Sequence, residues 1–328
     1  MIDGKWSEPR KISEGSNWFI NWADFPVLSV HAGNMAAHWL RRSGGDTYDY
    51  DVIARFYDGD RQQWSGDTQV NTSGIEAEHG FVSMLPTGDE STLITWLDGR
   101  NTKSQPERGA MTLRGAEFDA SGKRLREWKL DNSVCDCCQT SSAMTAQGPV
   151  VVYRDRTADE VRDTYIVRFA DGRWTRPQPV YQDGWQVMGC PVNGPAVAAR
   201  DETVAVVWFT GKDASPKVQL AVSSDSGETF SAPTLVAGPD TNGRVDTVIL
   251  DSGEIVVSWI ALTDSDASIM LSRFGADGIF TDTVDVATIS PSRRSGFPVI
   301  DSIDNSVYVS WTDIGDLPRV RVARVTFE

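Results

Sequence analysis

Short runs of β-branched and other apolar residues, each ending in an aromatic residue, recur along the whole chain. The aromatic residues that end them lie 51 to 57 residues apart. The runs are Ala36-Ala37-His38-Trp39, 93–96, 150–153, 204–208, 255–259 and 307–311. They are short and show no 3.6-residue apolar period, so they predict β-strands rather than helices. The regular return of one unit predicts a repeat architecture.

Each of these runs is followed by a second strand-like run and then by a turn signal. Residues 51–56, 163–169 and 269–274 are examples of the second run. The turn signals are Asp58-Gly59, Asp171-Gly172, Ser226-Gly227 and Asp277-Gly278, dipeptides that accept positive φ in a hairpin. A further short strand precedes each aromatic-ended run and another follows each turn. Four antiparallel strands repeated about every 50 residues predict an all-β chain that forms one six-bladed β-propeller.

The predicted blades span approximately 20–72, 73–132, 133–182, 183–238, 239–288, and 289–328 joined to 1–15. The last blade combines the two chain ends, because residues 167–177 of the third blade align with residues 323–325 followed by residues 3–9. We therefore expect the N-terminal strand to complete the C-terminal blade. Such closure joins the ring through a strand ladder and leaves no free blade edge inside it.

The charge of the chain limits its partners. With 31 basic and 46 acidic residues the net charge is −15, which repels phosphate backbones and anionic membrane surfaces. We expect neither a nucleic-acid partner nor a membrane span, since the longest strongly apolar run, 204–209, is far shorter than the roughly 20 residues that cross a bilayer. The first residues lack the basic and apolar regions of a signal peptide. We expect a secreted or periplasmic monomer whose leader is absent from this sequence, with a cytoplasmic location as the alternative.

One turn carries a sharper motif. Residues 223–230 read Ser-x-Asp-x-Gly-x-Thr-aromatic, which resembles the Asp-box of the sialidase (BNR-repeat) superfamily. In such a turn the carboxylate of Asp225 accepts backbone N–H bonds, Gly227 takes positive φ, and Phe230 packs under the hairpin. Ser223 is the first residue of the motif. We interpret all four residues as structural. The resemblance agrees with six blades and implies a sialidase-like fold.

Topology places the candidate ligand-binding residues on one face of the ring. In a four-stranded antiparallel blade, the loop before the first strand and the loop between the second and third strands share a face, opposite the Asp-box turns. Loops at the end of a rigid ring are where a ligand site is expected. The candidate ligand-binding residues on this channel-mouth face are Trp22, Arg100, Arg154, Asn193, Arg244, Arg293 and Arg294.

The resemblance to sialidases implies a specific chemistry. Members of the family clamp the substrate carboxylate with three arginines, whose planar guanidinium groups suit a carboxylate, and use a tyrosine nucleophile and an acid/base aspartate. The candidate catalytic residues here are Asp24, Glu78, Asp136, Asp246 and Tyr50. The family's Phe-Arg-Ile-Pro signature is replaced by Trp22-Ala23-Asp24-Phe25-Pro26, so the first arginine is missing from its expected place. The expected function is an exo-glycosidase acting on an anionic, carboxylated sugar, and the alternatives are a non-catalytic glycan- or protein-binding propeller and a thiol-rich metal or redox site.

All four cysteines fall in the mouth loops of two neighbouring blades. Cys135, Cys137 and Cys138 open the third blade, and Cys190 opens the fourth. In an exported protein we expect a disulfide from Cys137 or Cys138 to Cys190 that staples the blades. If the thiols stay reduced, one alternative is a soft metal, copper(I) or zinc, held by the thiolates with His79 nearby. A redox site and inert buried thiols are the others.

Overall fold

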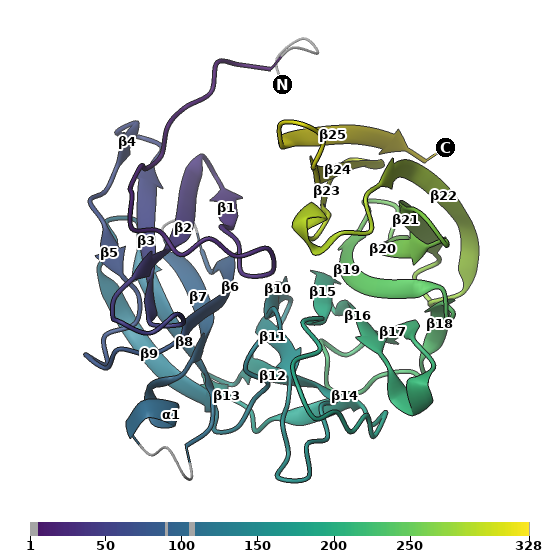
Figure 1. Cartoon of the computed structure of the whole chain (residues 1–328), viewed down its shortest axis with the longest axis horizontal. Coiled ribbons are helices and arrows are strands. Elements are labelled where there is room, and N and C mark those ends of the chain that lie inside the picture. The colour runs from purple at the N-terminus through teal and green to yellow at the C-terminus, as the bar shows by residue number, and fades with distance from the viewer. Residues whose placement is uncertain (1–5, 89–90, 105–108, 328) are drawn as a thin grey trace.

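The six-bladed β-propeller predicted from the repeats is the fold of the chain. The computed structural model describes residues 6–88, 91–104 and 109–327. Six antiparallel sheets follow one another around a central channel in chain order, from purple to yellow in Figure 1. In the part of the chain that is described, no helix has the length and apolar character needed to cross a membrane.

The first three blades lie in the N-terminal half of the chain. In the first and third, two short pieces pair with the third strand and together make an interrupted outer strand. The strands are β1 (Leu28–His31), β2 (Asn34–Arg42), β3 (Tyr50–Asp58), β4 (Gln63–Trp64) and β5 (Thr68–Gln69); β6 (His79–Pro86), β7 (Ser91–Asp98), β8 (Thr112–Asp119) and β9 (Arg124–Asp131); and β10 (Ser141–Thr145), β11 (Gly148–Arg154), β12 (Thr164–Ala170), β13 (Arg173–Trp174) and β14 (Gln178–Tyr181). The short helix α1 (Arg100–Ser104) follows β7.

The last three blades follow the same order of strands. Their strands are β15 (Ala196–Arg200), β16 (Thr203–Thr210), β17 (Lys217–Ser223) and β18 (Thr234–Ala237); β19 (Thr241–Ile249), β20 (Ile255–Leu262), β21 (Ala267–Phe274) and β22 (Phe280–Ile289); and β23 (Val299–Ile303), β24 (Ser306–Asp313) and β25 (Arg319–Thr326). Two 3-10 turns, η1 (Lys212–Ala214) and η2 (Arg293–Ser295), lie on loops of these blades.

The aromatic-ended runs form the second strand of each blade. They are almost wholly buried in the first five blades, whereas Tyr308, Ser310 and Trp311 of the sixth are partly exposed. In β16 all five residues from Val204 to Trp208 are inaccessible to solvent. A strand inside a blade is covered by the blade before it and the blade after it, so its apolar residues form a continuous run rather than an alternating one. The described residues form five apolar clusters, each shared by two neighbouring blades from the first–second pair to the fifth–sixth pair. Burial between blades therefore holds the ring together.

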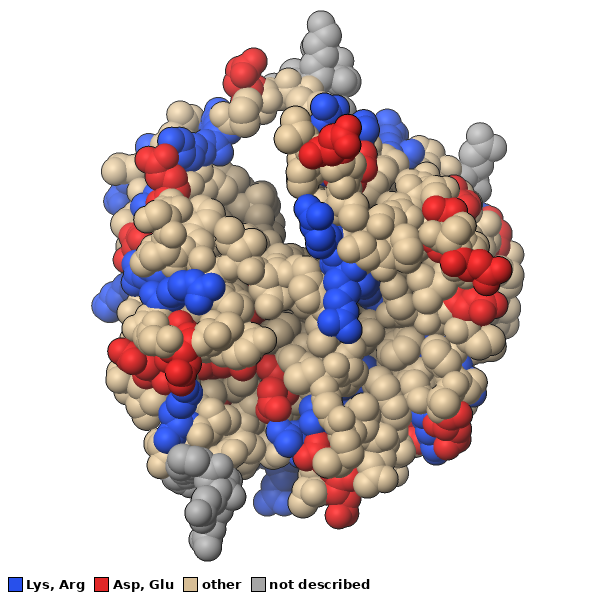
Figure 2. Space-filling model, in the orientation of Figure 1, with Lys and Arg blue, Asp and Glu red and all other residues tan. Residues whose placement is uncertain are grey.

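The junction between the sixth and first blades is more open. The sixth sheet has three described strands, and Trp6 to Gly15 carry no strand. The predicted closing strand falls partly on residues 1–5, which lie outside the described residues. The N-terminal segment runs from the first blade towards β25 (Figure 1), and Figure 2 shows an opening beneath it. A groove of about 550 Å³ lies here, between residues 20–26 and β23–β25.

Two β-bulges at equivalent places in the second and fifth blades shape the channel mouth. The register shifts after Gly80 in β6 and after Gly243 in β19. The next residues, Phe81 and Arg244, both take φ of +53°. A positive φ turns one peptide of the strand away from the ladder. In the second blade the redirected N–H of Phe81 reaches the loop of the first blade.

Candidate active site

A tyrosine hydroxyl bridges two carboxyl groups at the junction of the first and second blades. Tyr50 begins β3, Glu78 immediately precedes β6, and Asp24 lies in the loop before β1. The Tyr50 Oη is 2.9 Å from Oδ2 of Asp24 and 3.1 Å from Oε1 of Glu78. Because both carboxyl oxygens bond one hydroxyl, they lie no more than about 6 Å apart. The sequence-predicted Asp24, Tyr50 and Glu78 thus form one cluster.

Burial sets the protonation of this cluster. Desolvation raises the pKa of Asp24 to about 7, although hydrogen bonds from Phe81 and Tyr50 oppose the rise. Desolvation, with the charges of Asp24 and Asp136, raises the pKa of Glu78 to about 8 against the opposing bond from Tyr50. The pKa of Tyr50 is raised well above its ordinary value by burial and by the two carboxyls. The two carboxyls therefore exchange protons near neutral pH.

The hydrogen-bond pattern shows which carboxyl keeps its proton. A hydroxyl has a single hydrogen, so it donates to one carboxyl and accepts from the other. Asp24 already accepts the Phe81 N–H at 2.8 Å on its other oxygen, which favours its ionised form. Glu78 is then the group that donates to Tyr50. Glu78 is also partly exposed, whereas Asp24 and Tyr50 are 3% and 1% exposed.

Neighbouring groups hold the tyrosine in place. The Phe19 ring stacks on the Tyr50 ring at 4.1 Å, and the Nδ1 of His79 lies 3.1 Å from the Tyr50 carbonyl oxygen. Position 80 requires glycine because Asp24 and Tyr50 lie close to its backbone. A Cβ there would press on Oδ2 of Asp24 and lie 2.9 Å from Cε2 of Tyr50. Sequence reasoning identified neither Phe19 nor Gly80, because their roles depend on segments that are far apart in the chain.

Asp136 supplies a second partly exposed carboxyl group near Glu78. Its oxygens bind Nη1 of Arg156 at 2.8 and 3.1 Å, and Arg156 in turn binds Glu160. Its charge is one of the causes that raise the pKa of Glu78. Asp136 therefore joins the candidate site, as the sequence predicts, as a carboxylate fixed by a guanidinium.

Arginine and aromatic side chains gather on the same loops. The guanidinium groups of Arg244 and Arg293 lie 5.1 and 5.8 Å from the Trp22 ring, which stacks on Phe297 at 5.8 Å. Arg244 is 6% exposed and donates to the carbonyl oxygen of Gly296. Burial and the charge of Arg293 lower the pKa of Arg244 to about 10. Two like charges side by side attract an anion.

A cavity of about 450 Å³ follows the inner strands of the ring. It is lined by Asp24 and Gln139 on one side and by Asp246 and Phe297 on the other. Basic side chains run along the edge of the central opening, with acidic side chains across from them (Figure 2). Arg294 lines the neighbouring groove between the first and sixth blades together with Trp22.

Several predicted site residues hold the scaffold instead. Arg100 pairs with the buried Asp98 at 2.7 Å. Arg154 is 1% exposed and donates to the carbonyl oxygens of Arg162, Asn193 and Phe209. Both guanidinium groups are thus held by protein groups, Arg154 at the end of β11 and Arg100 at the start of α1, and these contacts do not support a substrate clamp.

Asn193 and Asp246 have similar scaffold roles. The side-chain oxygen of Asn193 accepts the Arg244 N–H at 2.8 Å, so it secures the bulge of β19. The carboxyl of Asp246 accepts the N–H groups of Thr247 and of Ile300, both at 2.9 Å, and so links the fifth and sixth blades. Desolvation raises the pKa of Asp246 to about 7. Its contacts place it in the ring rather than in the Tyr50 cluster.

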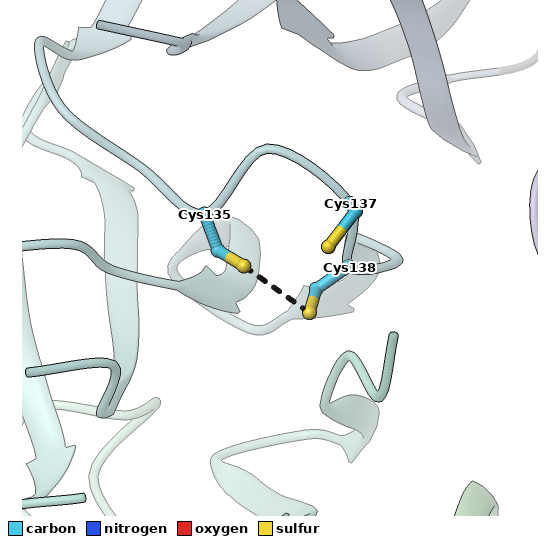
Figure 3. A group of neighbouring side chains, drawn as sticks. All are labelled: Cys135, Cys137 and Cys138. Atoms are coloured by element: carbon cyan, nitrogen blue, oxygen red, sulfur yellow. Dashed lines mark hydrogen bonds between the residues drawn. The ribbon is translucent and has the colours of Figure 1, made fainter. Parts of the chain in front are cut away.

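The cysteines carry free thiols, and the predicted link to Cys190 is not formed. Cys135, Cys137 and Cys138 lie on the loop between β9 and β10 with their sulfur atoms within 4.8 Å of one another (Figure 3). Hydrogen bonds from Cys137 and Cys138 hold the pKa of Cys135 well below its usual range. The grouping found among the described residues does not include His79, which instead lies against Tyr50 and Asp98.

The predicted structural turn has the expected contacts. Asp225 accepts the N–H and the hydroxyl of Thr229 at 2.9 and 2.6 Å, and the Ser223 hydroxyl at 2.7 Å. Although desolvation opposes it, these bonds lower the pKa of Asp225 to about 2. Gly227 takes φ of +82°, and Phe230 packs against the core shared by the third and fourth blades. The turn is a structural element.

The sequence matches no family model, and no protein of curated function matches it. Solved structures do share its shape. The α-L-arabinofuranosidase Arb93A of Fusarium graminearum has a TM-score of 0.60 at 11% identity over 92% of both chains. The Hadza microbial sialidase Hz136 has a TM-score of 0.60 at 13% identity, covering 92% of this chain and 65% of that one. The NanB sialidase of Streptococcus pneumoniae has a TM-score of 0.55 at 10% identity, covering 88% and 64%. The chain thus has the six-bladed propeller fold of the sialidases and of the GH93 arabinofuranosidase, a likeness that at these identities concerns the fold alone.

Proposed function

We propose that the protein is a glycoside hydrolase that removes a terminal carboxylated sugar at the channel mouth, with Glu78 as the proton donor. The observation that carries the proposal is the Tyr50 hydroxyl shared by Asp24 and Glu78. A general acid works best when its pKa lies near the working pH. A general acid must also be reachable by the substrate. Glu78 has a pKa of about 8 and is partly exposed, so it meets both requirements.

The other residues have distinct roles in this proposal. Glu78 gives its proton to the leaving oxygen as the glycosidic bond breaks, and Asp136, paired with Arg156, supplies the carboxylate that assists the attacking water. Asp24 and Tyr50 are positioning residues, because the ionised Asp24 holds the Tyr50 hydroxyl and that hydroxyl orients Glu78. The charges of Arg244 and Arg293, beside the flat Trp22 ring, favour a sugar that carries a carboxylate.

The test compares aryl glycosides of a sialic acid, a uronic acid and arabinofuranose. We expect release of the aryl group from a carboxylated substrate, with kcat falling above about pH 8 as Glu78 loses its proton. Replacing Glu78 with Gln removes the donor, and general acid–base catalysis is typically worth about 100- to 10,000-fold in rate. The exposed Glu76, replaced in the same way, is the matched control and is expected to leave the rate unchanged.

Tyr50→Phe separates a positioning role from a structural one. Once Glu78 has lost its proton, the Tyr50 hydroxyl can turn to donate to the Glu78 carboxylate, which lowers the pKa of Glu78. Loss of the hydroxyl therefore raises that pKa and moves the alkaline limb of the kcat profile to higher pH. Turnover of the arabinofuranoside alone would contradict the carboxylated substrate. Glycan binding with no turnover of any substrate, equal in wild type and Glu78→Gln, would overturn the proposal in favour of a binding propeller.

A further inference from the structure

Three thiols of one loop converge on a single point. The sulfur atoms of Cys135, Cys137 and Cys138 all lie within 4.8 Å of one another, and those of Cys135 and Cys138 are 3.4 Å apart. In Figure 3 the Cys135 and Cys138 side chains point towards each other, and the Cys137 sulfur lies beside them. Cys135 and Cys138 are each 1% exposed, and Cys137 is partly exposed.

Buried positive charge faces this cluster. Arg162, which is 2% exposed, donates from Nη1 to the sulfur of Cys135 at 3.0 Å. Its orientation is fixed by Glu160, whose carboxylate lies 2.6 Å from Nη2. A guanidinium group placed in this way offsets the negative charge of thiolates that would otherwise be costly to bury.

We propose that Cys135, Cys137 and Cys138 form a binding site for a copper(I) ion. Thiolate sulfur is the ligand type that copper(I) favours. Three thiolates about 2.3 Å from one ion lie about 4 Å apart, which small side-chain rotations reach from the present positions. The ion stays copper(I) throughout, each thiol releases its proton to solvent on binding, and no electron is transferred. The Arg162 guanidinium then faces a site with a net charge of −2.

The number of ligands favours copper(I) over zinc. Structural zinc takes four protein ligands in a tetrahedron. The candidate fourth thiol, Cys190, lies on the loop of the next blade near Cys137, is exposed, and is not part of the described group of mutually close sulfur atoms. Burial also argues against a thiol-exchange site, because an attacking thiol needs access to the reactive sulfur. Neither Cys135 nor Cys138 offers that access.

The experiment is an anaerobic titration of the whole, reduced protein with copper(I), in competition with a chromogenic copper(I) chelator. We expect one copper(I) per chain, with three sulfur ligands in the X-ray absorption spectrum. This readout needs no variant and no hydrolytic substrate, so it fails or succeeds independently of the proposed glycosidase activity. The protein as purified is analysed for metals and for free thiols in parallel.

Three variants sharpen the result. Replacing Cys138 with Ser removes a ligand and is expected to weaken copper(I) binding more than replacing Arg162 with Gln. The Arg162 change removes only a supporting charge, and such changes typically cost about 10- to 100-fold in affinity. Cys190→Ser is the matched control and is expected to bind as tightly as wild type. Folding of each variant is checked by near-UV circular dichroism.

Three results would overturn the inference. One is the absence of stoichiometric copper(I) binding by the reduced wild-type protein. Another is zinc bound in preference to copper(I) and lost in Cys190→Ser, which would indicate a four-thiolate zinc site. The third is a Cys135–Cys138 disulfide that forms when the copper(I)-treated protein is exposed to oxidised glutathione, which takes up the two electrons and two protons, because this would make the pair a redox dithiol.

Discussion

The buried carboxyl of Asp24 makes a prediction about stability that can be worked out in numbers. Its pKa is about 7 in the folded protein, against an ordinary value of 3.8. Between these pH values the folded chain holds a proton that the unfolded chain has lost, so the free energy of unfolding falls as pH rises. At about 1.4 kcal/mol per pH unit, ionised Asp24 destabilises the fold by up to about 4 kcal/mol at pH 7 and above.

Replacing Asp24 with Asn removes this titration. We expect the slope of unfolding free energy against pH, between pH 5 and 7, to become less negative by up to about 1.4 kcal/mol per pH unit. Urea denaturation followed by tryptophan fluorescence measures the slope at each pH. Asp264→Asn, at an exposed position, is the matched control and should run parallel to wild type. If the Asp24→Asn curve also runs parallel to wild type, Asp24 is already ionised between pH 5 and 7 in the folded protein, and burial does not raise its pKa to about 7.

Three further predictions follow from other contacts. Gly80→Ala, whose Cβ would press on Asp24, should abolish hydrolysis and lower the thermal midpoint, and normal activity would contradict the close approach. Arg293→Ala should raise KM for a carboxylated substrate by about 10- to 100-fold, as expected for a lost charged hydrogen bond, while kcat stays unchanged; the exposed Arg200→Ala is its control. Asp225→Asn should lower the thermal midpoint at pH 7 but not near pH 2, because a carboxyl with a folded pKa of about 2 stabilises the fold only where it is ionised; an equal loss at both pH values would refute this.

The fold could be predicted from sequence because its determinants are local and repeated. A strand such as β16 is buried between two blades, so its residues must be apolar on both faces and form an unbroken apolar run in the sequence. The shape of the turn at Ser223–Phe230 is likewise local, since the hydrogen bonds of the Ser223 and Asp225 side chains join residues at most four apart. The face of the ring that carries the site follows from strand direction alone.

The direction of individual loop side chains could not be predicted in the same way. Arg154 and Arg244 both come from loops or bulges of the mouth face, yet Arg154 turns inward to three carbonyl oxygens while Arg244 lies beside Trp22. The difference arises from the positive φ at Arg244 and from the groups each blade presents to the next. Neither the backbone angle nor the neighbouring blade's groups can be recognised from the identity of the arginine residue in the sequence.

The Tyr50 cluster shows why a site of this kind is assembled rather than encoded by a motif. Asp24, Tyr50 and Glu78 come from three segments, and only the bulge after Gly80, with Phe81 at φ of +53°, brings an N–H onto Asp24 and fixes which carboxyl is ionised. The glycine is the one local signal, because any side chain there would collide with the carboxyl. A glycine followed by a positive-φ residue in the first strand of a blade is therefore the feature to look for in related propellers, since it marks where one blade reaches into the loop of its neighbour.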